Sequence, residues 1–66
     1  MSVSEAAFKI EKAIGHDDNA ITNQDVSHFE HTNDVDLMDA LVWAGKNQVE
    51  MGTPSQHLTT DLAAVY

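Results

Sequence analysis

Side chains suited to binding a protein partner recur on one face of a helix that the sequence predicts over residues 34–51. They are spaced by three or four residues and comprise Asp36, Asp39, Trp43, Asn47 and Glu50. The only Trp of the chain stands in the middle of this stripe. A rigid aromatic ring among acids is typical of a protein-binding surface. The alternative is that Trp43 packs on the first helix or on the chain's last turn and completes a small core.

Acidic residues are concentrated in the middle of the chain, which has a net charge of -8 and no Arg. No Lys or Arg lies between Lys12 and Lys46, whereas the acids in that interval are Asp17, Asp18, Asp25, Glu30, Asp34, Asp36 and Asp39. Such a block is solvated and attracts a basic surface. We therefore add Asp34 and the Asp17–Asp18 pair to the candidate binding residues, with Phe8 as a possible aromatic anchor.

Two groups of residues have spacings that resemble those of metal-binding sites. The segment from Asp17 to Asp25 resembles the later half of an EF-hand calcium loop. Ile14 would then fall on the first ligand position and Asn19 on the position that requires glycine, so a solvated loop is the better interpretation. His28 and His31 have a spacing that could hold a transition metal weakly or tie binding to pH, but two histidines alone do not make a metal site. We expect no metal and no cofactor.

Catalysis and direct nucleic-acid binding are both disfavoured. The chain contains no Gly-x-Ser-x-Gly, phosphate-loop or HExxH motif, and short helices leave little room for a substrate pocket. Three Lys and no Arg cannot neutralise a run of phosphates. We expect a protein that is not an enzyme and does not bind DNA or RNA itself.

Helical periodicity predicts an all-α fold, a small single-domain bundle of three main helices plus one short helix. The predicted ranges are about 3–14, 23–31, 34–51 and 54–65. The apolar positions of the first helix are Val3, Ala7, Ile10 and Ile14, flanked by Ala6 and Ala13. Phe8 points away from that face. The predicted inward face of the third helix consists of Leu37, Met38, Leu41, Ala44 and Gln48, with Val42 and Val49 less central. The apolar side of the last helix consists of Leu58, Leu62, Val65 and Tyr66.

Capping residues mark the predicted helix ends. Ser2 with Glu5, and Thr22 with Asp25, have the spacing of helix starts, and Gly15 follows the first helix. The third helix is predicted to be capped by Asn33 and closed by Gly52, with Gly45 allowing a close helix crossing. Pro54 suits the first turn of the last helix, with Thr53 or Ser55 as its cap.

No segment has the pattern of a signal peptide or the roughly 20 apolar residues of a membrane span. The sequence therefore favours a cytoplasmic protein with no membrane contact.

Two functions fit these features. In the first, carboxylates imitate nucleic-acid phosphates and block the basic groove of a DNA- or RNA-handling enzyme. By analogy, small acidic proteins of phages and other mobile elements inhibit restriction, CRISPR or repair enzymes in this way. In the second, a structural or adaptor protein acts by self-association or by docking on another helix, and its acids only confer solubility. The expected partner is a protein with a basic surface or a second copy of the chain.

Overall fold

A computed structural model describes all residues from Met1 to Tyr66. The chain forms four α-helices, one 3-10 turn and no strand, which confirms the all-α prediction. The elements are α1 (Val3–Ile14), η1 (Asp18–Ala20), α2 (Asn23–His31), α3 (Val35–Lys46) and α4 (Thr53–Val65).

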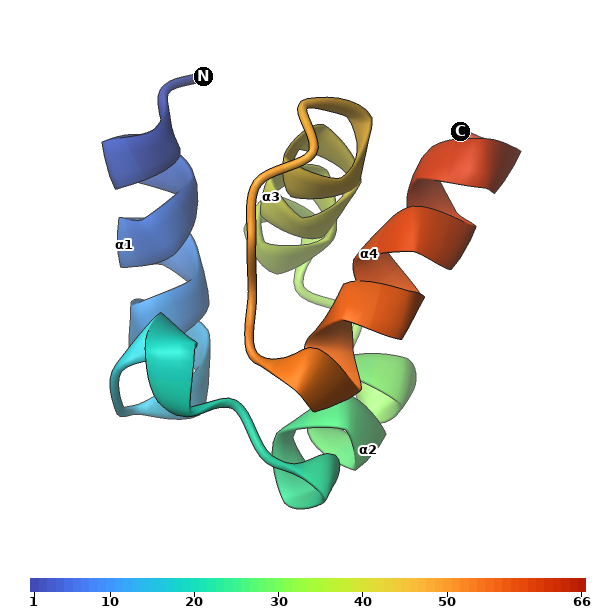
Figure 1. The fold of residues 1–66 in the computed structure, drawn as a ribbon. Coiled ribbons are helices and arrows are strands. Elements are labelled where there is room, and N and C mark those ends of the chain that lie inside the picture. Colours follow the sequence, from blue (N-terminus) through green and yellow to red (C-terminus); the bar gives the residue numbers. More distant parts are fainter.

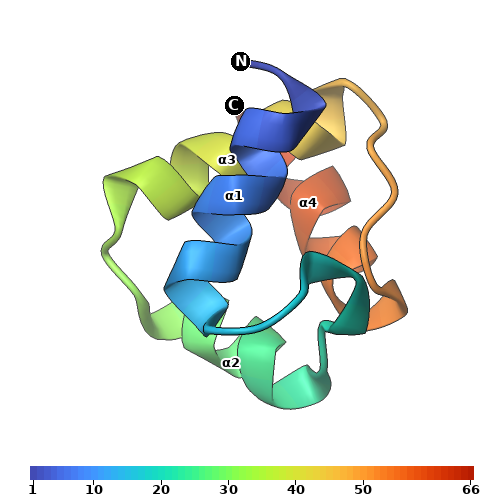
Figure 2. The ribbon, with the colours of Figure 1, turned by 90° about the vertical axis from the view of Figure 1, so that its left-hand side faces the viewer.

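The helix α3 stands between α1 and α4 and packs against both (Figure 1). The short helix α2 lies across the end of the bundle, where it packs on α4, and η1 lies against the end of α1 (Figure 2). Every helix except α4 contributes to the central apolar cluster, which consists of Ala6, Ile10, Ile21, Phe29, Leu37, Ala40 and Leu41. The side chains of Leu58 and Leu62 on α4 pack against it from outside.

The first helix has the predicted ends and most of the predicted buried face. The Ser2 hydroxyl accepts a hydrogen bond from the Glu5 backbone N–H (3.1 Å), and Gly15 closes the helix in the left-handed conformation (φ 82°). Ala6 and Ile10 are fully buried, whereas Val3 is exposed. Ala13 and Ile14 pack against the apolar cluster, so the predicted stripe was wrong only at Val3. Phe8 points away from the core, as predicted.

The third helix ends five residues earlier than predicted. It is capped by Asp34, not Asn33, through a bond from the Leu37 N–H (3.1 Å), and its last residue is Lys46. At its carboxyl end the Gln48 N–H donates to the Gly45 carbonyl (3.3 Å) and the Val49 N–H to the Ala44 carbonyl (2.9 Å).

This pair of bonds is a Schellman motif, which normally has glycine where Gln48 stands. Gln48 adopts the left-handed conformation (φ 56°) and thereby ends the helix. Periodicity predicted that Gln48 and Val49 extend the inward face of α3. They do not, because the helix ends before them.

Residues 47–52 run back along the bundle and bring the start of α4 beside Ile21 and α2 (Figure 1). Gly52 is the N-cap of α4, in place of the predicted Thr53 or Ser55, and Pro54 occupies the first turn as predicted. A Cβ on Gly52 would lie 3.0 Å from that of Ile21. Gly52 therefore allows the chain to pass close to Ile21, and it does not close α3.

The face that α4 buries is polar. Ser55 and Thr59 are fully buried, whereas Leu58 and Leu62 are half-buried and Val65 is exposed, so the predicted apolar face is not the most buried one. The Ser55 and Thr59 hydroxyls donate to the Gly52 and Gln56 carbonyls of their own helix (3.1 and 2.9 Å). Since these bonds satisfy both hydroxyls, the small side chains can lie in the interface at little cost.

Close contact between α3 and α4 explains this choice of small side chains. A Cβ on Gly45 would lie 2.0 Å from the Thr59 carbonyl oxygen. The predicted close crossing at Gly45 is thus present, and its partner is the backbone of α4. None of the helices is long and apolar enough to cross a membrane.

Candidate protein-binding face

An exposed aromatic ring lies between two depressions of the surface that are lined by charged side chains of both signs. Phe8 projects from α1 with 65% of its surface accessible. One depression beside it is lined by Glu11, His16 and Asp17, and the other by Lys9, Asp34 and Asp36. Phe8 and Lys12 border both. We call this surface the Phe8 face and define it by Phe8, Lys9, Glu11, Lys12, Asp17, Asp18, Asp34 and Asp36.

Two carboxylates of the first depression, those of Glu11 and Asp17, lie close to a third, that of Asp18. Ligand oxygens of Glu11, Asp17 and Asp18 all lie within 4.8 Å of one another. Partial burial, and then the neighbouring Asp17 and Glu11, raise the pKa of Asp18. The Asn19 backbone N–H, which donates to the Asp17 carboxylate (2.9 Å), lowers the pKa of Asp17. Asp17 therefore keeps its charge to lower pH than Asp18 does.

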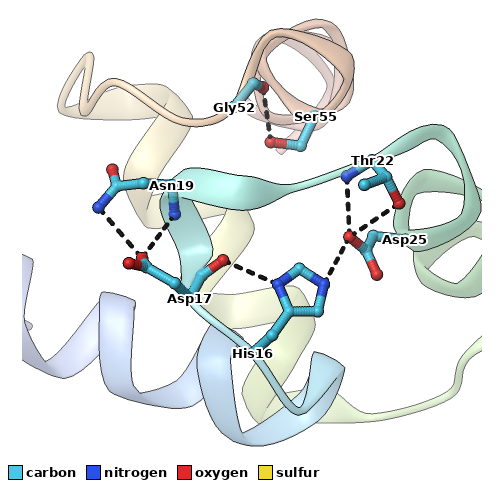
Figure 3. A network of polar contacts seen from close by, with 7 residues as sticks. All are labelled: His16, Asp17, Asn19, Thr22, Asp25, Gly52 and Ser55. Atoms are coloured by element: carbon cyan, nitrogen blue, oxygen red, sulfur yellow. Dashed lines mark hydrogen bonds and ion pairs between the residues drawn. The ribbon is translucent and has the colours of Figure 1, made fainter.

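His16 connects this depression to the start of α2 (Figure 3). Its Nδ1 lies 3.0 Å from the Asp17 carbonyl oxygen and its Nε2 lies 2.9 Å from Asp25 Oδ2. The same Asp25 oxygen accepts from the Thr22 backbone N–H (2.8 Å) and hydroxyl (3.2 Å), which is the predicted contact between Thr22 and Asp25. Both ring nitrogens face acceptors, so the doubly protonated ring can donate to both at once. This network holds η1 and the loop that forms one wall of the depression.

The second depression joins α1 to the start of α3. Asp34 uses one carboxylate oxygen to cap α3, and Asp36 follows in the first turn, where the helix dipole favours an acid. The Lys9 ammonium lies 3.9 Å from Asp36 Oδ1. This separation exceeds that of a hydrogen bond, and 79% of the Asp36 side chain is accessible, so the ion pair is weak.

Predicted binding residues divide into those that the Phe8 face includes and those that it does not. The face includes Phe8, Asp17, Asp18, Asp34 and Asp36, although Asp18 lines neither depression and lies beside Glu11 and Asp17. Asp39 is exposed on α3 and borders neither depression.

The other predicted residues form no continuous stripe. Trp43 is half-buried and packs against the apolar cluster, in agreement with the core alternative for its role. The Asn47 side chain donates to the Trp43 carbonyl (2.9 Å) and occupies the helix end. Glu50 lies beyond α3 in the segment 47–52. The predicted helical stripe was therefore wrong beyond Asn47, because α3 stops at Lys46.

Sequence reasoning did not select Lys9, Glu11, Lys12 or His16 as site residues. Two of them could have been predicted. Glu11 and Lys12 follow Phe8 by three and four residues on one helix, so their side chains must lie beside its ring. His16 had no such signal, because its contact with Asp25 depends on the path of the turn between them. His28 and His31 belong to no group of three potential metal ligands.

Comparison with known protein families, with curated proteins and with solved structures finds no match to this chain.

Proposed function

We propose that this protein is a small acidic binding module that occupies the basic groove of a nucleic-acid-handling protein and competes there with DNA or RNA. The observation on which the proposal rests is the exposed Phe8 ring with carboxylates on both sides. A ring supplies apolar contact area, and the surrounding acids select a basic partner.

Phe8 has the properties of an anchor. Removing a Phe side chain from water contributes about 1.5–3 kcal/mol, and little conformational entropy is lost because the ring has only two torsions. The fold does not use this contribution, since the ring lies outside the apolar cluster. A partner that covers Phe8 would gain it.

The charges on the Phe8 face favour a foreign partner over a second copy. Carboxylates outnumber the two lysines, and a dimer formed through this face would bring like charges together. A basic groove that normally holds phosphates is complementary to it. Restriction, CRISPR and repair enzymes are proposed as the class of target, by analogy with small acidic inhibitors of phages and other mobile elements. Such enzymes work in the cytoplasm of bacterial cells, and we propose the same compartment for this protein.

The test is a capture of partners from a lysate of the source organism with three immobilised proteins. These are the natural chain, the double variant Asp34→Asn with Asp36→Asn, and the control Asp61→Asn, whose charge is removed on α4 away from the Phe8 face. We expect a nucleic-acid-handling protein that the natural chain and the control retain at low salt. High salt or added DNA or RNA should release it, and the double variant should bind it weakly. A partner that stays bound in high salt and in excess nucleic acid would contradict the proposal.

Self-association or helix docking remains the second candidate, and exposed apolar side chains favour it. Val65 at the end of α4 and Tyr66 after it are 80% and 68% accessible, and Val35 is exposed on α3. Trp43 packs against the apolar cluster and is half-buried, so it offers a partner less surface than these side chains do. Sedimentation at high concentration in high salt tests it. A dimer that Val65→Ser disrupts would support self-association, whereas a monomer would exclude it.

A further inference from the structure

The ring of His16 joins the turn after α1 to the first turn of α2 (Figure 3). Its Nδ1 lies 3.0 Å from the Asp17 carbonyl oxygen, and its Nε2 lies 2.9 Å from Asp25 Oδ2. The Asp17 carbonyl also accepts a hydrogen bond from the Ala20 N–H (3.0 Å), which closes η1. One imidazole therefore ties η1 to α2.

Both oxygen atoms that the ring faces are hydrogen-bond acceptors. A neutral imidazole has one N–H and one lone pair, so it can donate to only one of them and turns its lone pair toward the other. The doubly protonated ring donates to both. Its hydrogen bond to the Asp25 carboxylate is charge-assisted and is therefore stronger than a bond between neutral groups. The geometry suits the cation better than either neutral tautomer.

The charged groups around the ring act in the same direction. Asp25 on α2, Asp17 before η1 and Glu11 on α1 carry carboxylates, whereas Lys12 on α1 supplies one ammonium group. The Thr22 N–H, more than any other group, lowers the pKa of Asp25. Asp25 is therefore ionised throughout the range from about pH 5 to 8, in which histidine side chains ordinarily change charge.

We propose that His16 is a pH-sensitive clasp, which holds the turn 15–20 against α2 while the ring carries two protons and releases it at the Asp17 carbonyl when one proton is lost. The Nδ1 proton is the one that leaves, because the Asp25 carboxylate is a stronger acceptor than a carbonyl and retains the Nε2 proton. His16 and Asp17 line the first depression of the Phe8 face, so one wall of that depression loosens as the pH rises. The inference concerns the unbound chain and does not depend on the proposed function.

The first experiment measures urea unfolding at pH 5.5 and pH 8 for the natural chain, His16→Gln and His57→Gln. A hydrogen bond that only the doubly protonated ring makes in the folded protein contributes stability at the lower pH, and this contribution is lost as the pH rises. We expect the ratio of folded to unfolded protein to fall about fivefold more in the natural chain than in His16→Gln. The factor is modest because 40% of the His16 side chain is accessible.

His57→Gln is the matched control. The His57 ring also lies beside a carboxylate, that of Asp61 (3.1 Å), but its side chain is 85% accessible and contacts only its own helix. This variant should lose as much stability between the two pH values as the natural chain does.

A second variant and an NMR measurement identify the contact that opens. Asp25→Asn keeps an acceptor for the Thr22 N–H but carries no charge, so the dependence of its stability on pH should approach that of His16→Gln. In the natural chain at pH 5.5, both His16 nitrogens should show the ¹⁵N shifts of protonated nitrogen. At pH 8 only Nδ1 should lose them.

Two results would overturn the clasp. If the natural chain, His16→Gln and Asp25→Asn lost stability equally between the two pH values, the charge of the whole molecule would explain the loss. If the ring at pH 8 carried its proton on Nδ1, the contact with the Asp17 carbonyl would persist and nothing would be released there.

Discussion

At the scale of single residues, the Asp25 carboxylate makes several contacts that stabilise the fold. One of its oxygens accepts hydrogen bonds from the Thr22 N–H and hydroxyl and contacts His16. Its side chain is only 13% accessible. These contacts fasten the start of α2 to the turn after α1, and thereby hold one wall of the Phe8 face.

We expect Asp25→Ala to lower the free energy of unfolding by about 1 kcal/mol, the usual cost of losing a helix cap. Urea unfolding at pH 7 measures it. Glu30→Ala is the control, since Glu30 is exposed on the same helix and makes no hydrogen bond, and it should cost less than about 0.5 kcal/mol. Equal losses in the two variants would contradict a special role for Asp25.

Because of the same contacts, the contribution of Asp25 to the free energy of unfolding depends on pH. The Thr22 N–H, more than any other group, holds the pKa of Asp25 below its ordinary value of 3.8. A folded-state pKa below the unfolded one means that the carboxylate stabilises the fold above about pH 4. This contribution disappears as the pH falls through the folded pKa. The difference in stability between the natural protein and Asp25→Ala should therefore shrink when unfolding is repeated below pH 3.8.

At the scale of helices, the crossing of α3 and α4 depends on the missing side chain of Gly45. Alanine has a higher helix propensity than glycine by about 1 kcal/mol, so Gly45→Ala would stabilise an isolated helix. Here the added Cβ would overlap the Thr59 carbonyl oxygen. We expect a net loss of about 1–3 kcal/mol, measured by thermal or urea unfolding. Asp39→Ala, on the exposed side of α3, should not be destabilising; a stabilised Gly45→Ala protein would show that the helices cross less closely.

At the end of α3, by contrast, we expect a change to glycine to stabilise the fold. Gln48 holds the left-handed conformation that costs a side-chain-bearing residue roughly 1 kcal/mol. Gln48→Gly should therefore raise the free energy of unfolding by about 0.5–1 kcal/mol, despite the greater flexibility of glycine in the unfolded chain. Gln24→Gly within α2 is the matched control and should lower it by about as much. Destabilisation by both changes would argue against the observed Schellman motif.

At the scale of the whole molecule, charge repulsion acts across the entire fold. The molecule measures 23 × 22 × 21 Å, which is shorter than the Debye length of about 30 Å at 0.01 M salt and longer than the 8 Å at 0.15 M. With a net charge of -8, its acids repel one another at low salt. We expect Tm to rise by roughly 4 °C or more when sodium chloride is raised between these concentrations, which corresponds to about 1 kcal/mol.

Calorimetry at the two salt concentrations measures the rise. The double variant Glu30→Gln with Asp39→Asn, which removes two exposed charges, should show a smaller one. A Tm that stays constant or falls with added salt would mean that the ion pairs of the fold outweigh its repulsions.

Local signals in the sequence determined the helical class, most helix starts and the concentration of acids. Caps such as Ser2 and Thr22 act within one turn, and glycine after a helix acts on its own backbone, so Gly15 could be interpreted without knowing the fold. The exposure of Phe8 followed from periodicity alone, because a residue off the apolar stripe of α1 has no core to enter.

Only the tertiary structure decided where the long helix ends and which side chains meet. Periodicity continued past Lys46, but the chain had to turn back for α4 to pack on Gly45, so Gln48 took a conformation that its residue type does not favour. That turn separated Glu50 from Asp36, and the approach of α1 to α3 placed Phe8 beside Asp34 and Asp36 instead. Contacts between residues far apart in the chain depend on how whole helices pack, and no local pattern specifies that packing.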